Sequence, residues 1–106
     1  MEVSAWKSGR VEQVDGVTFA IRIRIADRKI YFEGLQEVNV IVGTETHCFR
    51  LNREGFWNKC SELRDTDAIS PAIRNWLCKK GCLTWQKGRP PKFELKPLGN
   101  ARFQLT

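Results

Sequence analysis

The stretch KFELKPLGNARFQLT (residues 92–106) alternates apolar and polar side chains on both sides of a Gly-Asn pair. Side chains on a β-strand point alternately to its two faces, so Phe93 and Leu95 share one face, as do Phe103 and Leu105. A Gly-Asn pair between two such segments favours a tight turn. The stretch therefore predicts an antiparallel β-hairpin with one apolar face.

Period-two patterns also dominate the first half of the chain. They occur in VTFAIRIRI (residues 17–25), KIYFEG (29–34), EVNVIVG (37–43) and HCFRL (47–51). The first of these is the clearest, and the polar residues that follow it suit a tight connection to the second. Valine, isoleucine and aromatic residues favour strands. The first half therefore predicts a small antiparallel sheet of four strands.

Two helices are predicted between this sheet and the hairpin. Asn52 is suited to cap the first helix, whose apolar positions continue to Leu63. The second helix is better marked, because Ser70 is suited as its N-cap, Pro71 to its first position and Gly81 to its end. We expect these helices to pack against the sheet.

The order of elements is four strands, two short helices and a C-terminal hairpin, which predicts an α+β fold with a mostly antiparallel sheet. The 106 residues, 42% of them hydrophobic, are enough for one modest core, so we expect residues 1–106 to form a single domain. Neither a membrane-spanning run nor the apolar core of a signal peptide is present in the sequence. We therefore expect a cytoplasmic protein without a membrane partner.

The net charge of +6 belongs entirely to the second half of the chain. Residues 1–52 carry seven basic and seven acidic side chains, whereas residues 53–106 carry eleven and five. From Pro71 onward eight basic side chains face a single acidic one. Such asymmetry favours a polyanionic partner, above all nucleic acid. The alternative is a protein–protein interaction or structural module with no nucleic-acid partner, in which the basic half meets an acidic protein surface.

The segment QKGRPPK (residues 86–92) leads into the predicted hairpin. Pro90 and Pro91 have no N–H group to donate to a sheet, so the segment is expected to be irregular. Its Gly-Arg-Pro core resembles the AT-hook, a peptide that lies along the minor groove of A·T-rich DNA. This resemblance implies minor-groove contact by Arg89.

Residues 53–106 resemble a winged helix-turn-helix, in which the second helix enters the major groove and a hairpin wing contacts the backbone or the minor groove. The resemblance covers half the chain and is carried by SPAIRNWL (residues 70–77), the KKGCL step (79–83) and the basic hairpin. Together with the charge pattern it implies DNA binding through Arg74, Asn75, Lys79, Lys87, Arg89, Lys92 and Lys96.

Trp6 and Trp85 add a further interpretation, because tryptophan among basic residues is typical of surfaces that stack the bases of single strands or RNA.

Evidence for catalysis is thin. His47 is the sole histidine, with no evident acidic partner in the pattern. The cysteines include only one close pair, so we expect no metal site and no cofactor, with zinc bound through His47 as the weaker alternative. The sequence thus predicts a small, basic, non-enzymatic binding protein.

Overall fold

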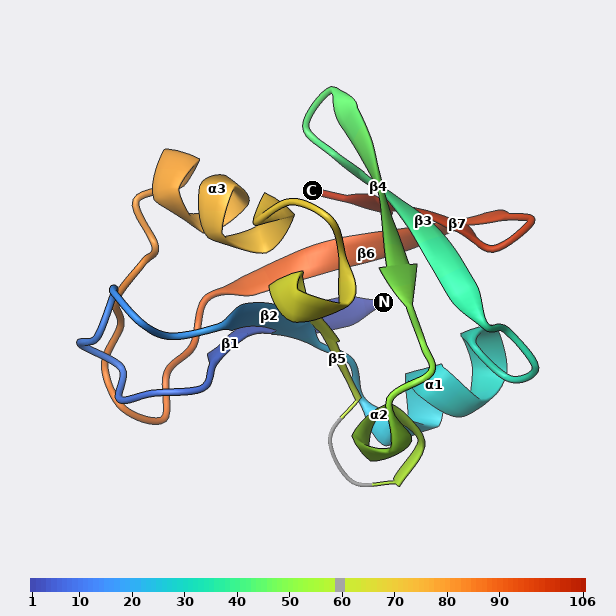
Figure 1. Cartoon of the computed structure of the whole chain (residues 1–106), viewed down its shortest axis with the longest axis horizontal. Helices are drawn as coiled ribbons and strands as arrows, with labels where there is room; N and C mark the ends of the chain where they lie inside the picture. The colour runs from blue at the N-terminus through green and yellow to red at the C-terminus, as the bar shows by residue number, and fades with distance from the viewer. Residues whose placement is uncertain (59–60) are drawn as a thin grey trace.

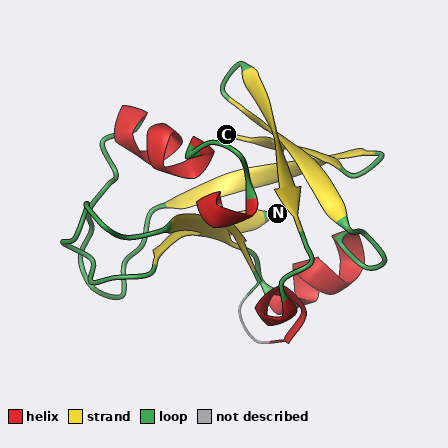
Figure 2. Ribbon diagram, viewed as in Figure 1, coloured by secondary structure: helices red, strands yellow, loops and turns green. Residues whose placement is uncertain are grey.

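The computed structural model describes residues 1–58 and 61–106. Figures 1 and 2 show a curled sheet with short helices around it. The strands of the described residues are β1 Glu2–Lys7, β2 Phe19–Arg22, β3 Glu37–Val42, β4 Glu45–Arg50, β5 Glu62–Arg64, β6 Lys92–Gly99 and β7 Arg102–Leu105. Their helices are α1 Ile25–Tyr31, α2 Glu54–Asn58, the 3₁₀ turn η1 Asp65–Asp67 and α3 Ala72–Lys79.

The strands form a sheet in the order β4-β3-β7-β6-β1-β2-β5. All neighbours are antiparallel except β3 and β7, which are parallel. The C-terminal hairpin therefore lies at the centre of the sheet. It joins β4-β3 on one side to β1-β2-β5 on the other. The predicted α+β fold, the hairpin and the strands at 37–43 and 47–51 are confirmed.

The core lies on the concave inner face of the sheet, where β3 and β4 run across the direction of β1, β2 and β6 (Figure 1). Phe32 stacks on Phe103 with 4.7 Å between ring centroids, and Phe56 meets Phe32 edge-on at 5.7 Å. Ile73 and Leu77 of α3 are buried in the same core. Burial of each such side chain stabilises the fold by roughly 1.5–3 kcal/mol.

The predicted first hairpin is wrong. β2 ends at Arg22, and α1 replaces the expected turn and second strand over residues 25–31. Arg28 and Phe32, one helical turn apart, are buried, whereas Ile30 at the middle of the expected strand is 69% exposed. The helical spacing of these buried side chains outweighs the local strand preference of the isoleucines, which depends on context.

α3 lies within the predicted second helix, but its cap differs from the prediction. Pro71 occupies the N-cap position, with no capping side chain. Both oxygens of the Asp65 carboxylate instead accept hydrogen bonds from α3, at 2.7 Å from Ile73 N and 2.9 Å from Arg74 N. The predicted cap, Ser70, contacts a side chain of β4 instead. The capping carboxylate therefore comes from η1 and not from the residue before the helix.

The remaining differences concern short elements. α2 begins two residues after Asn52 and is only five residues long. Leu63, expected on that helix, lies in β5, and the expected helical position Cys60 is outside the described residues. β1 was not predicted, because its three inward positions are Val3, Ala5 and Lys7, which make a weak apolar pattern.

Candidate nucleic-acid interface

The sheet has an outer face on the side away from the core. α3 packs on the inner face, where Trp76 contacts Phe93 with 6.0 Å between ring centroids. Lys92, the neighbour of Phe93 on β6, points to the opposite side and is exposed. The pairing of the strands places the outward side chains in two adjacent rows. One row holds Lys92, Ser4, Arg22 and Glu62, and the next holds Trp6, Ala20 and Arg64.

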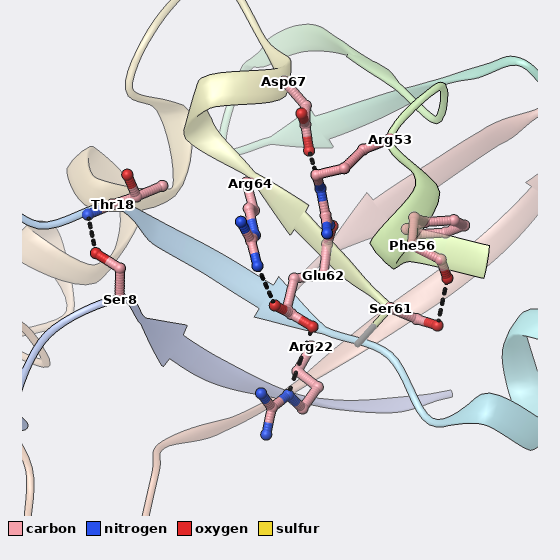
Figure 3. A network of polar contacts seen from close by, with 9 residues as sticks. All are labelled: Ser8, Thr18, Arg22, Arg53, Phe56, Ser61, Glu62, Arg64 and Asp67. Atoms are coloured by element: carbon pink, nitrogen blue, oxygen red, sulfur yellow. Dashed lines mark hydrogen bonds and ion pairs between the residues drawn. The ribbon is translucent and has the colours of Figure 1, made fainter. Parts of the chain in front are cut away.

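Glu62 lies at the β5 end of the first row and contacts one arginine from each row. Its carboxylate has no solvent exposure, with Oε1 3.0 Å from Arg64 Nη2 and Oε2 3.8 Å from Arg22 Nε. Figure 3 shows the two arginines approaching this carboxylate from opposite sides. Arg53 donates a hydrogen bond to the backbone oxygen of Glu62 and also approaches Asp67 (Figure 3). A buried carboxylate needs such compensation, so the Arg64 guanidinium is held in place by a hydrogen bond, whereas Arg22, 3.8 Å away, contributes only electrostatic attraction.

Trp6 lies beside these guanidinium groups on β1. The guanidinium carbon of Arg64 is 4.6 Å from the centroid of the Trp6 ring, and that of Arg22 is 5.9 Å away. Ala20 stands between Trp6 and Arg64 in their row and is fully buried. Its small side chain lets the ring and the guanidinium meet above it. Trp6 itself remains partly exposed.

The GRPP turn adjoins the Trp6 end of β1. Ala5 N donates a 2.8 Å hydrogen bond to Pro91 O, which continues the β1–β6 pairing beyond the end of β6. The turn itself is closed by Arg89 N, which donates to Gln86 O, and Gly88 has the positive φ of +81° that glycine tolerates best. The predicted irregular segment is therefore confirmed, and it runs past the end of β1 that carries the tryptophan.

Four of the residues predicted to bind lie on or beside this outer face. Lys92 Nζ is 3.6 Å from Glu2 Oε1, and Lys96 points outward two positions after Glu94. Lys87 and Arg89 are exposed in the adjoining turn. We give the name basic sheet face to the surface made of Trp6, Arg22, Arg64, Arg89, Lys92 and Lys96.

The other three predicted residues lie on α3, on the opposite side of the sheet. Arg74 is engaged in packing, since its Nη1 donates to Val14 O and its Nη2 is 3.6 Å from Asp15 Oδ1. Asn75 and Lys79 are exposed on the helix and border a hollow beside the β3–β4 turn. The structure therefore does not bring the helix residues and the hairpin residues onto one surface.

This arrangement differs from the winged helix-turn-helix that the second half of the sequence resembles. A wing projects beside the recognition helix, whereas β6 pairs with β1 and β7 pairs with β3 inside the sheet. The sequence carries no signal for these pairings, because alternation identifies a strand without identifying its neighbours.

Sequence reasoning also missed part of the basic sheet face. The alternation in VTFAIRIRI placed Arg22 on the polar side of its strand, which was a usable signal. Glu62 and Arg64 stand in a three-residue strand too short to show a pattern. Trp85, considered for stacking together with Trp6, instead packs against the ammonium group of Lys7, 4.4 Å from its ring centroid.

Lys7 is a buried cation on the inner face near the same end of the sheet. Its Nζ donates hydrogen bonds to Val11 O at 2.8 Å, to Gln13 O at 2.7 Å and to Leu83 O. Burial lowers the pKa of this ammonium group from its ordinary value. Lys7 thus ties the loop after β1 to the loop after α3, which is a structural role.

His47 has neighbours that the sequence did not reveal. Its Nδ1 is 3.0 Å from Ser70 Oγ and its Nε2 is 3.8 Å from Glu45 Oε2, beside a hollow of about 530 Å³. A serine next to a histidine is a starting point for nucleophilic catalysis. Here the Glu45 carboxylate is 75% exposed and lies beyond hydrogen-bond distance of the His47 ring.

Comparison with known proteins adds no family, since no family model, curated protein or solved structure matches the chain. Within the described ranges, no helix is long and apolar enough to cross a membrane. The same residues contain no group of three potential metal ligands, while Cys60 lies outside them. The candidate interface therefore rests on its geometry.

Proposed function

We propose that the protein is a non-enzymatic nucleic-acid-binding protein and that the basic sheet face contacts the nucleic acid. One observation carries the proposal: Trp6 lies partly exposed on the sheet with the guanidinium groups of Arg64 and Arg22 over its ring. Arginine binds phosphate in a planar, two-pronged fashion and stacks on bases, and tryptophan offers a surface to any base. The net charge of +6 favours the same class of partner.

The acidic side chains nearby offset only part of this charge. Glu2 is engaged by both Arg24 and Lys92, so it cancels one of these two positive charges, and Glu94 is paired with the N-terminal amine at 2.7 Å. Glu62 likewise cancels one of the two positive charges of Arg22 and Arg64. The remaining cations, among them Arg89 and Lys96, are exposed and free to approach phosphate groups.

The double variant Arg89→Ala/Lys92→Ala tests the proposal. Its affinity for a labelled oligonucleotide at low salt should fall, and the slope of log affinity against log salt should flatten by about two, because two phosphate contacts are lost. Lys79→Ala/Lys80→Ala is the matched control. It removes the same charge from two exposed positions at the end of α3, on the opposite side of the sheet, and should leave the slope closer to that of the wild type.

If the control pair flattened the salt slope more than Arg89→Ala/Lys92→Ala does, the interface would lie on the helical side of the sheet, and this would contradict the proposal. Lack of affinity for any nucleic acid even at low salt would favour the alternative, a partner protein with an acidic surface. Fluorescence anisotropy at several salt concentrations measures both variants under the same conditions.

A further inference from the structure

We infer that the basic sheet face binds single-stranded nucleic acid, with an unpaired base stacked on Trp6. The inference rests on the proposed function and specifies the ligand of that site. Three features carry it: the width of the sheet around Trp6, the fixed cation beside the ring, and the line of cations along β6.

The sheet around Trp6 is broader than the major groove of undistorted duplex DNA. Trp6 lies on β1, which has β6 on one side and β2 followed by β5 on the other. Neighbouring strands are about 4.8 Å apart, so these four backbones span about 14 Å before side chains are added. The major groove is about 12 Å wide and admits a helix or a two-stranded ribbon. Without distortion, which costs energy, a duplex would meet this face only with its phosphates, and Trp6 would have no base to contact.

The surroundings of Trp6 suit an unpaired base. The Arg64 guanidinium lies over the ring, 4.6 Å from its centroid, and is fixed there by the buried Glu62 carboxylate, so a base would stack on this guanidinium or on the part of the ring that it leaves exposed. Bases of single strands stack on aromatic rings and on guanidinium planes, because their own faces are free. An arginine that is ordered before the ligand arrives loses less conformational entropy on binding. The ring and the guanidinium thus form a prepared platform.

The cations of β6 offer a path for the phosphate backbone. Lys92 and Lys96 point to the same face of this strand, about 13 Å apart at 3.3 Å per residue, and Glu94 between them is paired with the N-terminal amine. Arg89 lies in the turn beyond, toward the Trp6 end of β1. A strand that follows β6 would meet these cations while its bases turn toward the platform on β1.

Titration of a single-stranded oligonucleotide and of a duplex of equal length tests the inference. At low salt the single strand should bind about tenfold more tightly or better, and it should quench tryptophan fluorescence. Trp6→Leu should weaken single-strand binding by about tenfold or more, whereas Trp6→Phe, which keeps an aromatic face, should retain most of the affinity. Loss of quenching in Trp6→Phe would identify Trp6 as the quenched residue. Circular dichroism checks that both variants are folded.

The possible outcomes test the single-strand inference and the proposed function separately. Equal or tighter binding of the duplex, or unchanged single-strand affinity in Trp6→Leu, would overturn this inference while leaving nucleic-acid binding intact. Failure of both oligonucleotides to bind the wild type at low salt would overturn the proposed function itself.

Discussion

Arg64 owes its position over the Trp6 ring to one carboxylate, that of Glu62, which also attracts Arg22. A completely buried carboxylate destabilises the folded state unless cations and hydrogen-bond donors compensate for its lost hydration. Here the compensation comes from a hydrogen bond with Arg64 and from the charge of the more distant Arg22, so the order of the long Arg64 side chain is a consequence of the burial. The residue that shapes the basic sheet face is therefore one that a ligand would not touch.

Replacing Glu62 by alanine removes this carboxylate and leaves its cations uncompensated. Because Arg22 and Arg64 are partly exposed, water replaces part of the lost interaction. We expect the free energy of unfolding to fall by about 1–3 kcal/mol. Glu62→Gln keeps the shape and one acceptor oxygen and should cost less. Urea titrations followed by circular dichroism compare the two, and an alanine variant as stable as the wild type would contradict the role given to Glu62.

At the scale of elements, the start of α3 depends on a carboxylate outside the helix. Asp65 accepts hydrogen bonds from Ile73 N and Arg74 N, while Pro71 at the N-cap offers no side chain to do so. We expect Asp65→Ala to lower the free energy of unfolding by about 1 kcal/mol, as is typical when a helix cap is lost. Ser70→Ala, which alters the cap expected from the sequence, should cost less. A larger effect at Ser70 in urea titrations would contradict this assignment.

The same carboxylate predicts a dependence of stability on pH. Burial raises the pKa of Asp65 above its ordinary value of 3.8, and this outweighs the hydrogen bonds from α3 and the nearby His47 and Arg74, which lower the pKa. The folded state therefore binds the proton more readily than the unfolded state does. The stabilisation that this bound proton gives to the folded state is complete below pH 3.8 and is lost as pH rises through the folded-state pKa of Asp65.

Relative to Asp65→Asn, which does not titrate, the wild type should lose stability as pH increases above 3.8 and then reach a plateau. Urea titrations of both proteins across the acidic range measure this difference. A difference that stays constant with pH, or one that grows in favour of the wild type as pH rises, would show that burial does not dominate at Asp65.

At the scale of the whole molecule, the C-terminal hairpin holds the two parts of the sheet together. Phe103 of β7 is 2% exposed and stacks on Phe32, which follows α1. We expect Phe103→Ala to lower the free energy of unfolding by about 3–5 kcal/mol. Ile30→Ala, at a position that is 69% exposed, should change it by less than about 0.5 kcal/mol. Near-equal stabilities of the two variants would mean that the hairpin projects like a wing and does not belong to the core.

The sequence by itself determined the elements whose signals are local. Alternation identified the strands at 37–43 and 47–51 and both strands of the hairpin, and proline and glycine marked the ends of the helix at 71–80. It also located the excess positive charge in the second half of the chain. These features follow from backbone geometry and composition, which each segment carries irrespective of its neighbours.

Only the tertiary structure decided which segments meet. Residues 25–31 became a helix because Arg28 and Phe32 find burial against partners distant in the chain, and no local pattern contains those partners. The hairpin lies between β1 and β3, so its cations point away from α3 and toward the side of the sheet that carries Trp6. Alternation fixes which side chains share a face of one strand, whereas the choice of neighbouring strand depends on how the whole core packs. The candidate interface therefore depends on which strands become neighbours in the folded protein.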